Sequence, residues 1–216
     1  MTYHAILFDL DGTLLNTLED LANATNDALT AFGLPTHPVD AYRYFIGEGA
    51  KNLMKNALPP AQRTEKIIQQ CLALFRENYE RTWDRATRPY DGVPEMLTTV
   101  QSKQVNVAVL SNKPDDFTRK CVEQLLSSWQ FTCVFGQRDG VPRKPDPTAA
   151  LEIAKILKCD PAEMLYVGDS GTDMQTAVAA GMFPVGALWG FREREELLSN
   201  GAKMLIAHPS ELLDLL

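Results

Sequence analysis

Two carboxylates, Asp9 and Asp11, stand two residues apart near the start of the chain. They follow an apolar run, residues 5–8, whose composition predicts a buried strand. Side chains at i and i+2 of an extended segment point to the same side, so both carboxylates face one small volume at the strand's carboxyl end. Gly12 permits a tight turn or the close approach of a ligand, and Thr13 adds a hydroxyl.

This pair of carboxylates has two chemical uses. Two like charges so close together are costly, and a hard divalent cation with oxygen ligands offsets that cost. Alternatively, one carboxylate takes up a proton, which gives a nucleophile beside a general acid. An acidic turn without further function is the third interpretation, because Asp-Gly is a common turn pair.

Further polar side chains follow the later predicted strands or share their loops: Ser111 and Asn112 after residues 105–110, Asp169, Ser170 and Asp173 after residues 164–167, and Lys144 in a loop of the same half. Open α/β sheets bind ligands outside the carboxyl ends of their strands. There, Asp169 can complete a metal site with Asp9, and Ser111 and Lys144 can bind phosphoryl oxygens. Taken singly, each residue also fits a plainer role as a helix cap or a surface charge.

The elements that must position these residues alternate along the second half of the chain. Predicted strands lie at residues 5–8, 105–110, 131–135, 164–167, 183–188 and 204–206. Predicted helices lie near residues 93–103, 115–127, 146–157, 172–180 and 209–216. This alternation predicts an α/β fold with a Rossmann-like parallel sheet and helices on both faces.

A purely helical segment interrupts this pattern after the first strand. Residues 16–84 show helical periodicity and no convincing strand. We therefore expect residues 1–15 and 85–216 to form the α/β core and residues 16–84 to be a helical insertion.

Composition narrows the class of protein. The 216 residues are 45% hydrophobic, enough to bury a core, and the net charge is −7. This charge argues against non-specific nucleic-acid binding and requires a local positive pocket for any anionic substrate. The four cysteines form no C-x-x-C pair, and no apolar run approaches the length of a membrane span. We expect a cytoplasmic protein without a signal peptide or a membrane segment.

In order and spacing, four motifs together resemble the haloacid dehalogenase-like superfamily: residues 9–13, Ser111, Lys144 and residues 168–173. The resemblance covers essentially the whole chain, and the insertion at 16–84 matches the family's small helical cap domain. Residues 45–51 and 143–147 are most similar to the phosphoglycolate phosphatase branch. Where relatives often carry Asp-Ser after the first strand, this chain has Asn16-Thr17, which can still cap a helix.

The resemblance implies a role for each residue of the core motifs. Asp9 would be the nucleophile that forms an aspartyl-phosphate, and Asp11 would protonate the leaving alkoxide and later activate water. Mg²⁺ would be held by the Asp9 carboxylate, the Asp11 backbone carbonyl and Asp169. Ser111 and Lys144 would stabilise charge on the transferred group.

Supporting roles are implied for other positions. Asp173, beside Ser170, would bind a metal-bound water or orient Lys144. Asn112 and the backbone amides of Gly12 and Thr13 would contact phosphate. The candidates for substrate contacts from the cap are Arg43, Glu48 and Lys51.

The implied activity is a Mg²⁺-dependent phosphatase acting on a small phosphorylated metabolite, with 2-phosphoglycolate as the first substrate to test. The protein would be a monomer or a homodimer. Four alternatives remain: a pyrophosphatase, a sugar phosphatase or phosphomutase, a phosphonate hydrolase with a Schiff base on Lys51, and a catalytically silent binding module. A dehalogenase is disfavoured because it has no use for an acid such as Asp11.

Overall fold

The computed structural model describes residues 3–216. A six-stranded sheet with the order β5-β4-β1-β6-β7-β8 forms its centre, and the neighbouring strands are parallel. The strands are β1 (Ala5–Phe8), β4 (Asn106–Pro114), β5 (Cys133–Gln137), β6 (Met164–Gly168), β7 (Phe183–Ala187) and β8 (Met204–Ile206). The predicted α/β fold with a parallel sheet is therefore confirmed.

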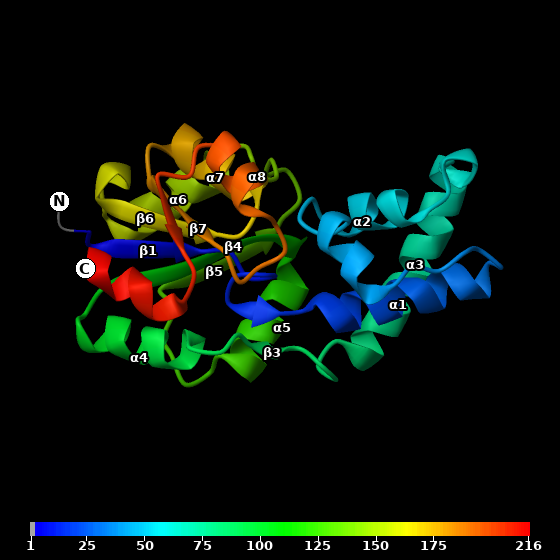
Figure 1. Ribbon diagram of the computed structural model, residues 1–216, viewed down its shortest axis with the longest axis horizontal. Coiled ribbons are helices and arrows are strands. Elements are labelled where there is room, and N and C mark those ends of the chain that lie inside the picture. The colour runs from blue at the N-terminus through cyan, green and yellow to red at the C-terminus, as the bar shows by residue number, and fades with distance from the viewer. Residues whose placement is uncertain (1–2) are drawn as a thin grey trace. The chain divides into compact units, whose positions relative to one another are not determined.

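Helices cover both faces of this sheet, as a parallel sheet requires. The helical segments in this part of the chain are α4 (Val93–Ser102), α5 (Asp115–Leu125), α6 (Thr148–Leu157), α7 (Gly171–Ala180), α8 (Arg194–Ser199) and the 3₁₀ segments η3 (Pro161–Glu163) and η4 (Pro209–Leu215). In Figure 1, α7 and α8 lie over one face, and α4 and η4 lie over the other. The core under α6 and α7 joins Leu7 of β1, Leu110 of β4 and Tyr166 of β6 to Ile153 and Ala177.

The chain divides into two compact units. One contains the residues through Leu15 together with Pro89–Leu216, and the other is Asn16–Arg88. The second unit is built from α1 (Leu18–Ala31), η1 (Val39–Tyr44), α2 (Ala50–Ala57), η2 (Pro60–Gln62) and α3 (Glu65–Thr82). Two short strands, β2 (Leu15–Asn16) and β3 (Arg88–Pro89), pair with each other.

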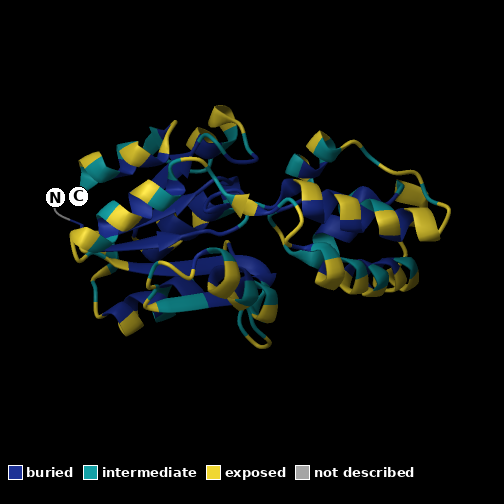
Figure 2. Cartoon of the chain, turned by 90° about the horizontal axis from the view of Figure 1, so that it is seen from below, coloured by how far each residue is buried: buried dark blue, intermediate teal, exposed yellow. Residues whose placement is uncertain are grey.

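The helical unit has its own buried core and its own buried hydrogen bonds. Figure 2 shows helices with buried and exposed residues in turn, as amphipathic helices require, whereas the sheet is largely buried. On α3 the rings of Phe75 and Tyr79 stack with centroids 5.5 Å apart. The buried carboxylate of Asp20 accepts hydrogen bonds from the backbone N–H groups of Ala86 and Thr87.

Several element boundaries differ from those expected. Strand β4 continues past residue 110 to Pro114, because Pro114 pairs with Gln137 of β5 after a register shift. Helix α8, β2 and β3 were not expected, and the helix expected at residues 209–216 is a 3₁₀ helix, η4, at residues 209–215. All four cysteines are free thiols. Among the helices within residues 3–216, none combines the length and apolar character needed to cross a membrane.

Candidate active site

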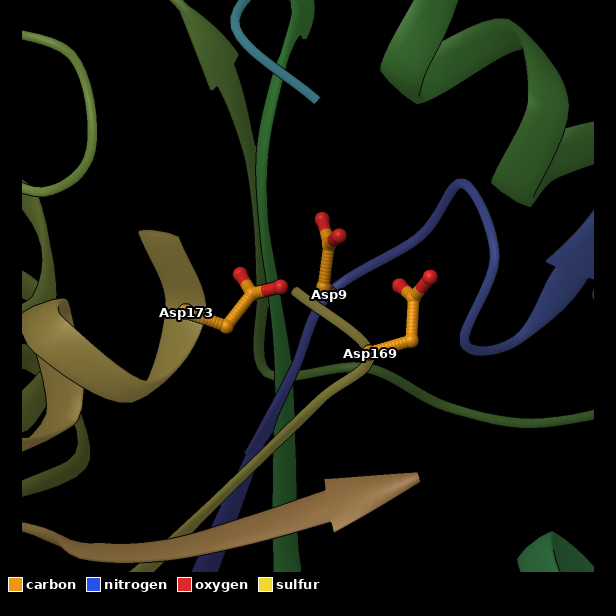
Figure 3. A group of neighbouring side chains, drawn as sticks. All are labelled: Asp9, Asp169 and Asp173. Atoms are coloured by element: carbon orange, nitrogen blue, oxygen red, sulfur yellow. The ribbon is translucent and has the colours of Figure 1, made fainter. Parts of the chain in front are cut away.

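Three carboxylates meet where β1 and β6 end. Asp9 directly follows β1, Asp169 directly follows β6, and Asp173 lies in the first turn of α7. Because β1 and β6 are neighbours in the sheet, each of the three residues brings one carboxylate oxygen within 4.8 Å of the others. Figure 3 shows the three side chains arriving from three separate segments. All three are buried, so their charges need compensation.

Asp169 is held by donors from two loops. Thr13 Oγ1 donates to Asp169 Oδ1 at 3.0 Å, and the Phe191 backbone N–H donates to Oδ2 at 2.7 Å. The Trp189 indole in turn donates to the Thr13 carbonyl at 2.9 Å. The carboxylate therefore has a fixed orientation, and each of its oxygens still has a lone pair for a further ligand.

Two glycines make room for this arrangement. Gly12 has a φ of +90°, and a Cβ added there would overlap the carboxylate of Asp169. A Cβ added at Gly190 would overlap the Cβ of Asp169 and would come within 2.5 Å of the Gly12 carbonyl oxygen. No other residue type allows these two backbone segments to approach Asp169 so closely.

Lys144 supplies the positive charge inside the cluster. Its ammonium nitrogen lies 2.8 Å from Asp9 Oδ1 and 2.7 Å from Asp173 Oδ1, and it donates to the Leu110 carbonyl at 3.0 Å. The contact with Asp9 is an ion pair without hydrogen-bond alignment, which leaves Asp9 Oδ1 able to accept another ligand. Burial opposes the charged form of Lys144, but the Asp173 and Asp9 carboxylates outweigh it and raise the lysine pKa well above its usual range.

Asn112 fixes the backbone of Lys144 from both sides. Its side-chain oxygen accepts the Lys144 N–H at 3.0 Å, and its amide nitrogen donates to the Lys144 carbonyl at 3.2 Å. Sequence reasoning expected Asn112 to contact phosphate. In this structure its amide group is engaged with the loop that carries Lys144.

Asp173 is occupied by protein donors. Ser170 Oγ donates to Asp173 Oδ2 at 2.6 Å, the Ser170 N–H donates to the same oxygen at 3.1 Å, and Lys144 holds the other oxygen. Ser170 in turn accepts the Asp173 N–H, which completes a capping box at the start of α7. These contacts suit a residue that orients Lys144 rather than one that ligates a metal.

Burial changes the acidity of the other two carboxyls. Desolvation, followed by repulsion from Asp173, raises the pKa of Asp9 well above its usual value. The same two causes raise the pKa of Asp169 to about 7, although hydrogen bonds from Phe191 and Thr13 oppose the shift. Both carboxyls therefore gain from a cation that stabilises their ionised forms.

Asp11 points toward a different lysine. Lys113 Nζ lies 3.0 Å and 3.2 Å from the two Asp11 oxygens, and the Lys113 side chain is only 4% exposed. Ser111 is also buried, and its hydroxyl accepts the Lys113 N–H at 3.2 Å. The α/β unit thus contains all the core residues singled out from the sequence, at one edge of the sheet.

The three remaining predicted residues belong to the helical unit. Arg43 pairs with Asp40 at 3.5 Å, Glu48 accepts a hydrogen bond from Asn52 at 3.0 Å, and Lys51 pairs with Glu65 at 2.7 Å. These are partly or fully exposed contacts, which contribute little to stability. The role of these three side chains in substrate binding stays a prediction.

The donors at this site fit a hard divalent cation. Asp9 and Asp169 offer carboxylate oxygens, which are the ligands Mg²⁺ prefers, and Asp9 Oδ1 lacks an aligned hydrogen bond. The backbone carbonyl of Asp11 is a third oxygen donor in the same loop.

Sequence reasoning missed four contributors: Lys113, Tyr166, Trp189 and Phe191. Lys113 was visible as the residue after Ser111-Asn112, at the end of a strand. Tyr166 OH lies 3.4 Å from Asp173 Oδ1, inside what was expected to be an apolar strand. Phe191 acts through its backbone N–H, which no side-chain motif reveals.

Comparison with known proteins gives a consistent result. A family model described as haloacid dehalogenase-like hydrolase matches residues 6–187. A phosphoglycolate phosphatase of Pseudomonas putida is 32% identical over 205 residues, which cover 93% of this chain and 75% of that protein. A phosphoglycolate phosphatase of Aquifex aeolicus is 32% identical over 211 residues, covering 98% of this chain and 95% of the relative.

Solved structures show the same likeness. A crystal structure of a candidate phosphoglycolate phosphatase from Lactobacillus delbrueckii subsp. bulgaricus has a TM-score of 0.94 and 29% sequence identity, covering 100% of this chain and 99% of the other.

Proposed function

Since the chain belongs to the haloacid dehalogenase-like hydrolase family, we propose that it is a Mg²⁺-dependent phosphatase of small phosphomonoesters, with 2-phosphoglycolate as the first candidate substrate. The observation that carries this proposal is the position of Asp9. It is a buried carboxylate at the end of β1, paired at 2.8 Å with Lys144 and close to Asp169. The relatives named phosphoglycolate phosphatase support the choice of substrate.

In the first half-reaction, an Asp9 oxygen attacks phosphorus and the bond from phosphorus to the ester oxygen breaks. Asp11, which must be protonated when the ester binds, gives its proton to the departing alkoxide, which would otherwise be a poor leaving group. In the second half-reaction, Asp11 takes a proton from water, the water oxygen attacks phosphorus, and the bond to Asp9 breaks. Phosphate leaves, and Asp9 and Asp11 regain their starting forms.

The other residues hold charge in place during both steps. Lys144 faces the developing charge on the transferred group, while Asn112 and Asp173 keep its backbone and ammonium fixed. The Ser111 hydroxyl donates to a phosphoryl oxygen. The Gly12 and Thr13 amides, also expected to contact phosphate, instead donate to the Leu15 and Leu10 carbonyls, at 2.9 and 3.3 Å. Mg²⁺, when held by Asp9, Asp169 and the Asp11 carbonyl, supplies positive charge that offsets repulsion between Asp9 and the phosphate.

We assign the role of cap to the helical unit, with Arg43, Glu48 and Lys51 as its candidate substrate contacts. A phosphoryl site alone recognises only what all phosphomonoesters share, so specificity needs contacts to the leaving group. The four free thiols fit a reducing compartment, and we propose a cytoplasmic location.

The test is phosphate release from 2-phosphoglycolate, with Mg²⁺ and with EDTA, by wild type and Asp9→Asn. We expect metal-dependent release by wild type and a loss of at least about 10³-fold in the variant, because its amide cannot attack phosphorus. Asp116→Asn on the exposed surface of α5 is the matched control and should keep wild-type activity.

A substrate panel separates the alternatives. Preferred release from pyrophosphate identifies a pyrophosphatase, and preference for hexose phosphates or a requirement for a sugar bisphosphate identifies the sugar-directed activities. Trapping of substrate on Lys51 by borohydride identifies a phosphonate hydrolase. Folded protein that binds Mg²⁺ but releases phosphate from no ester overturns the phosphatase proposal in favour of a silent binding module.

A further inference from the structure

Lys113 is a second buried cation at the active site, separate from Lys144. Its side chain is 4% exposed, comparable to the 3% of Lys144, so neither ammonium group is a solvated surface charge. A lysine is almost never this buried unless an anion compensates it. The core motifs that identified the site give Lys113 no role.

The position of Lys113 is fixed by its surroundings. Its backbone N–H donates to Ser111 Oγ at 3.2 Å, and its carbonyl accepts from Thr118 Oγ1 at 3.2 Å. Gly136 of the adjacent strand β5 lies so close that an added Cβ would come within 2.6 Å of the Lys113 carbonyl oxygen. These contacts fix the backbone of Lys113, and the ion pair with Asp11 fixes the place of its ammonium group.

That place is beside the residue that handles the leaving group. Lys113 Nζ lies within hydrogen-bond distance of both oxygens of Asp11, at 3.0 and 3.2 Å. To protonate the ester oxygen, a carboxyl oxygen of Asp11 must turn toward the substrate. That oxygen cannot bind the Lys113 ammonium group at the same time. Lys113 and the ester oxygen therefore compete for Asp11. A substrate with an anionic group next to its ester oxygen removes this competition, because that group can bind Lys113 in place of Asp11.

We infer that Lys113 recognises a carboxylate carried by the leaving group next to the ester oxygen, and that this carboxylate replaces Asp11 as the partner of the lysine. The inference rests on the proposed phosphatase function and names the substrate class of the same site. In such an ester a single methylene separates the ester oxygen from the carboxylate carbon. The carboxylate thus lies about one hydrogen-bond length from the atom that Asp11 must reach.

This assignment differs from the expectation that the helical unit supplies the cation. Arg43 and Lys51 are 38% and 43% exposed and already pair with Asp40 and Glu65. Exposed cations give weak, salt-screened recognition, whereas a buried ammonium discriminates strongly between a carboxylate and a neutral group.

The experiment compares two esters that differ only in this charge: 2-phosphoglycolate, and its amide, in which –CONH₂ replaces the carboxylate. The kcat/KM ratio of the two is measured for wild type, Lys113→Met and Lys113→Arg. We expect wild type to prefer the carboxylate ester by on the order of 10²-fold. Lys113→Met should reduce this ratio to near unity, and Lys113→Arg should restore much of it because it keeps the positive charge.

Lys155→Met is the matched control. Lys155 is exposed on α6, and its substitution removes the same charge from the molecule while leaving the ratio at the wild-type value. Equal losses on both esters in Lys113→Met, or an unchanged ratio, would overturn the inference. If Lys113→Met does not fold, Lys113→Arg decides: a preserved preference supports the inference, and equal losses on both esters overturn it.

Failure of the proposed function gives a different result. Wild type would then release phosphate from neither ester, while its thermal unfolding and Mg²⁺ binding remain normal. Release from both esters without a preference keeps the phosphatase function and removes only the role of Lys113.

Discussion

Gly190 determines, by having no side chain, how closely the loop after β7 approaches Asp169. We predict that Gly190→Ala weakens Mg²⁺ binding by about 10- to 100-fold, because a methyl group there displaces the Asp169 side chain from its fixed orientation. Calorimetric titration with Mg²⁺ measures this directly and does not depend on turnover.

The control for Gly190→Ala is Gly140→Ala. Gly140 has a φ of +75° and open space around its Cα, so alanine there costs only about 1 kcal/mol in backbone strain and leaves Mg²⁺ affinity unchanged. An unaltered affinity in Gly190→Ala would mean that the Phe191 loop has no part in positioning Asp169.

Among the secondary-structure elements, the first turn of α7 contributes both to the stability of the fold and to the proposed active site. Ser170 caps the helix and also donates to Asp173, which holds Lys144. We predict that Ser170→Ala lowers the free energy of unfolding by about 1 kcal/mol and also lowers kcat several-fold. Urea unfolding and phosphate release measure the two effects on the same preparation.

Thr64 provides a comparison, since its hydroxyl accepts the Ile67 N–H at 3.3 Å and caps α3 in the helical unit. Thr64→Ala should lose a similar free energy of unfolding, about 1 kcal/mol, with no change in kcat. If both variants keep wild-type kcat, the capping box has a structural role only.

The strands also show how much of the fold could be predicted from the sequence. The buried strands and the residues that directly follow them were predictable, because a parallel sheet needs continuous apolar strands and gathers the residues at their ends. These two rules place Asp9 and Asp169 at the same end of the sheet, but their proximity also requires β1 and β6 to be neighbours, which only the structure shows. The extension of β4 to Pro114 was not predictable, because it depends on pairing with Gln137, a partner more than 20 residues away.

Contacts between residues that are far apart in the sequence could not be predicted from local sequence patterns either. Asp20 fits the first turn of α1 as an acidic residue near a helix N-terminus. In the structure its carboxylate instead accepts hydrogen bonds from the backbone of residues 86–87 and from the Thr87 hydroxyl. Likewise, the Lys113–Asp11 ion pair joins residues 102 positions apart, and only the sheet brings them together.

For the whole molecule, the buried carboxylates link stability to pH and to metal. The pKa of Asp169 is raised from 3.8 to about 7, first by burial and then by Asp173. A carboxyl with a raised pKa in the folded state contributes stability that is fully present below its unfolded pKa and is lost as pH rises through its folded pKa. Asp9 is shifted in the same direction.

We therefore predict that, in EDTA, the contribution of these carboxyls to the free energy of unfolding decreases between about pH 4 and pH 7. Mg²⁺ should stabilise the protein strongly at about pH 8 and little at about pH 5, because protons compete with the metal for Asp169. Thermal unfolding across this range, with and without Mg²⁺, measures both trends.

Asp169→Asn should weaken both the pH dependence in EDTA and the stabilisation by Mg²⁺, since an amide neither titrates nor carries the charge that binds the cation. Equal stabilisation by Mg²⁺ at the two pH values would show that the cation binds elsewhere than between Asp9 and Asp169.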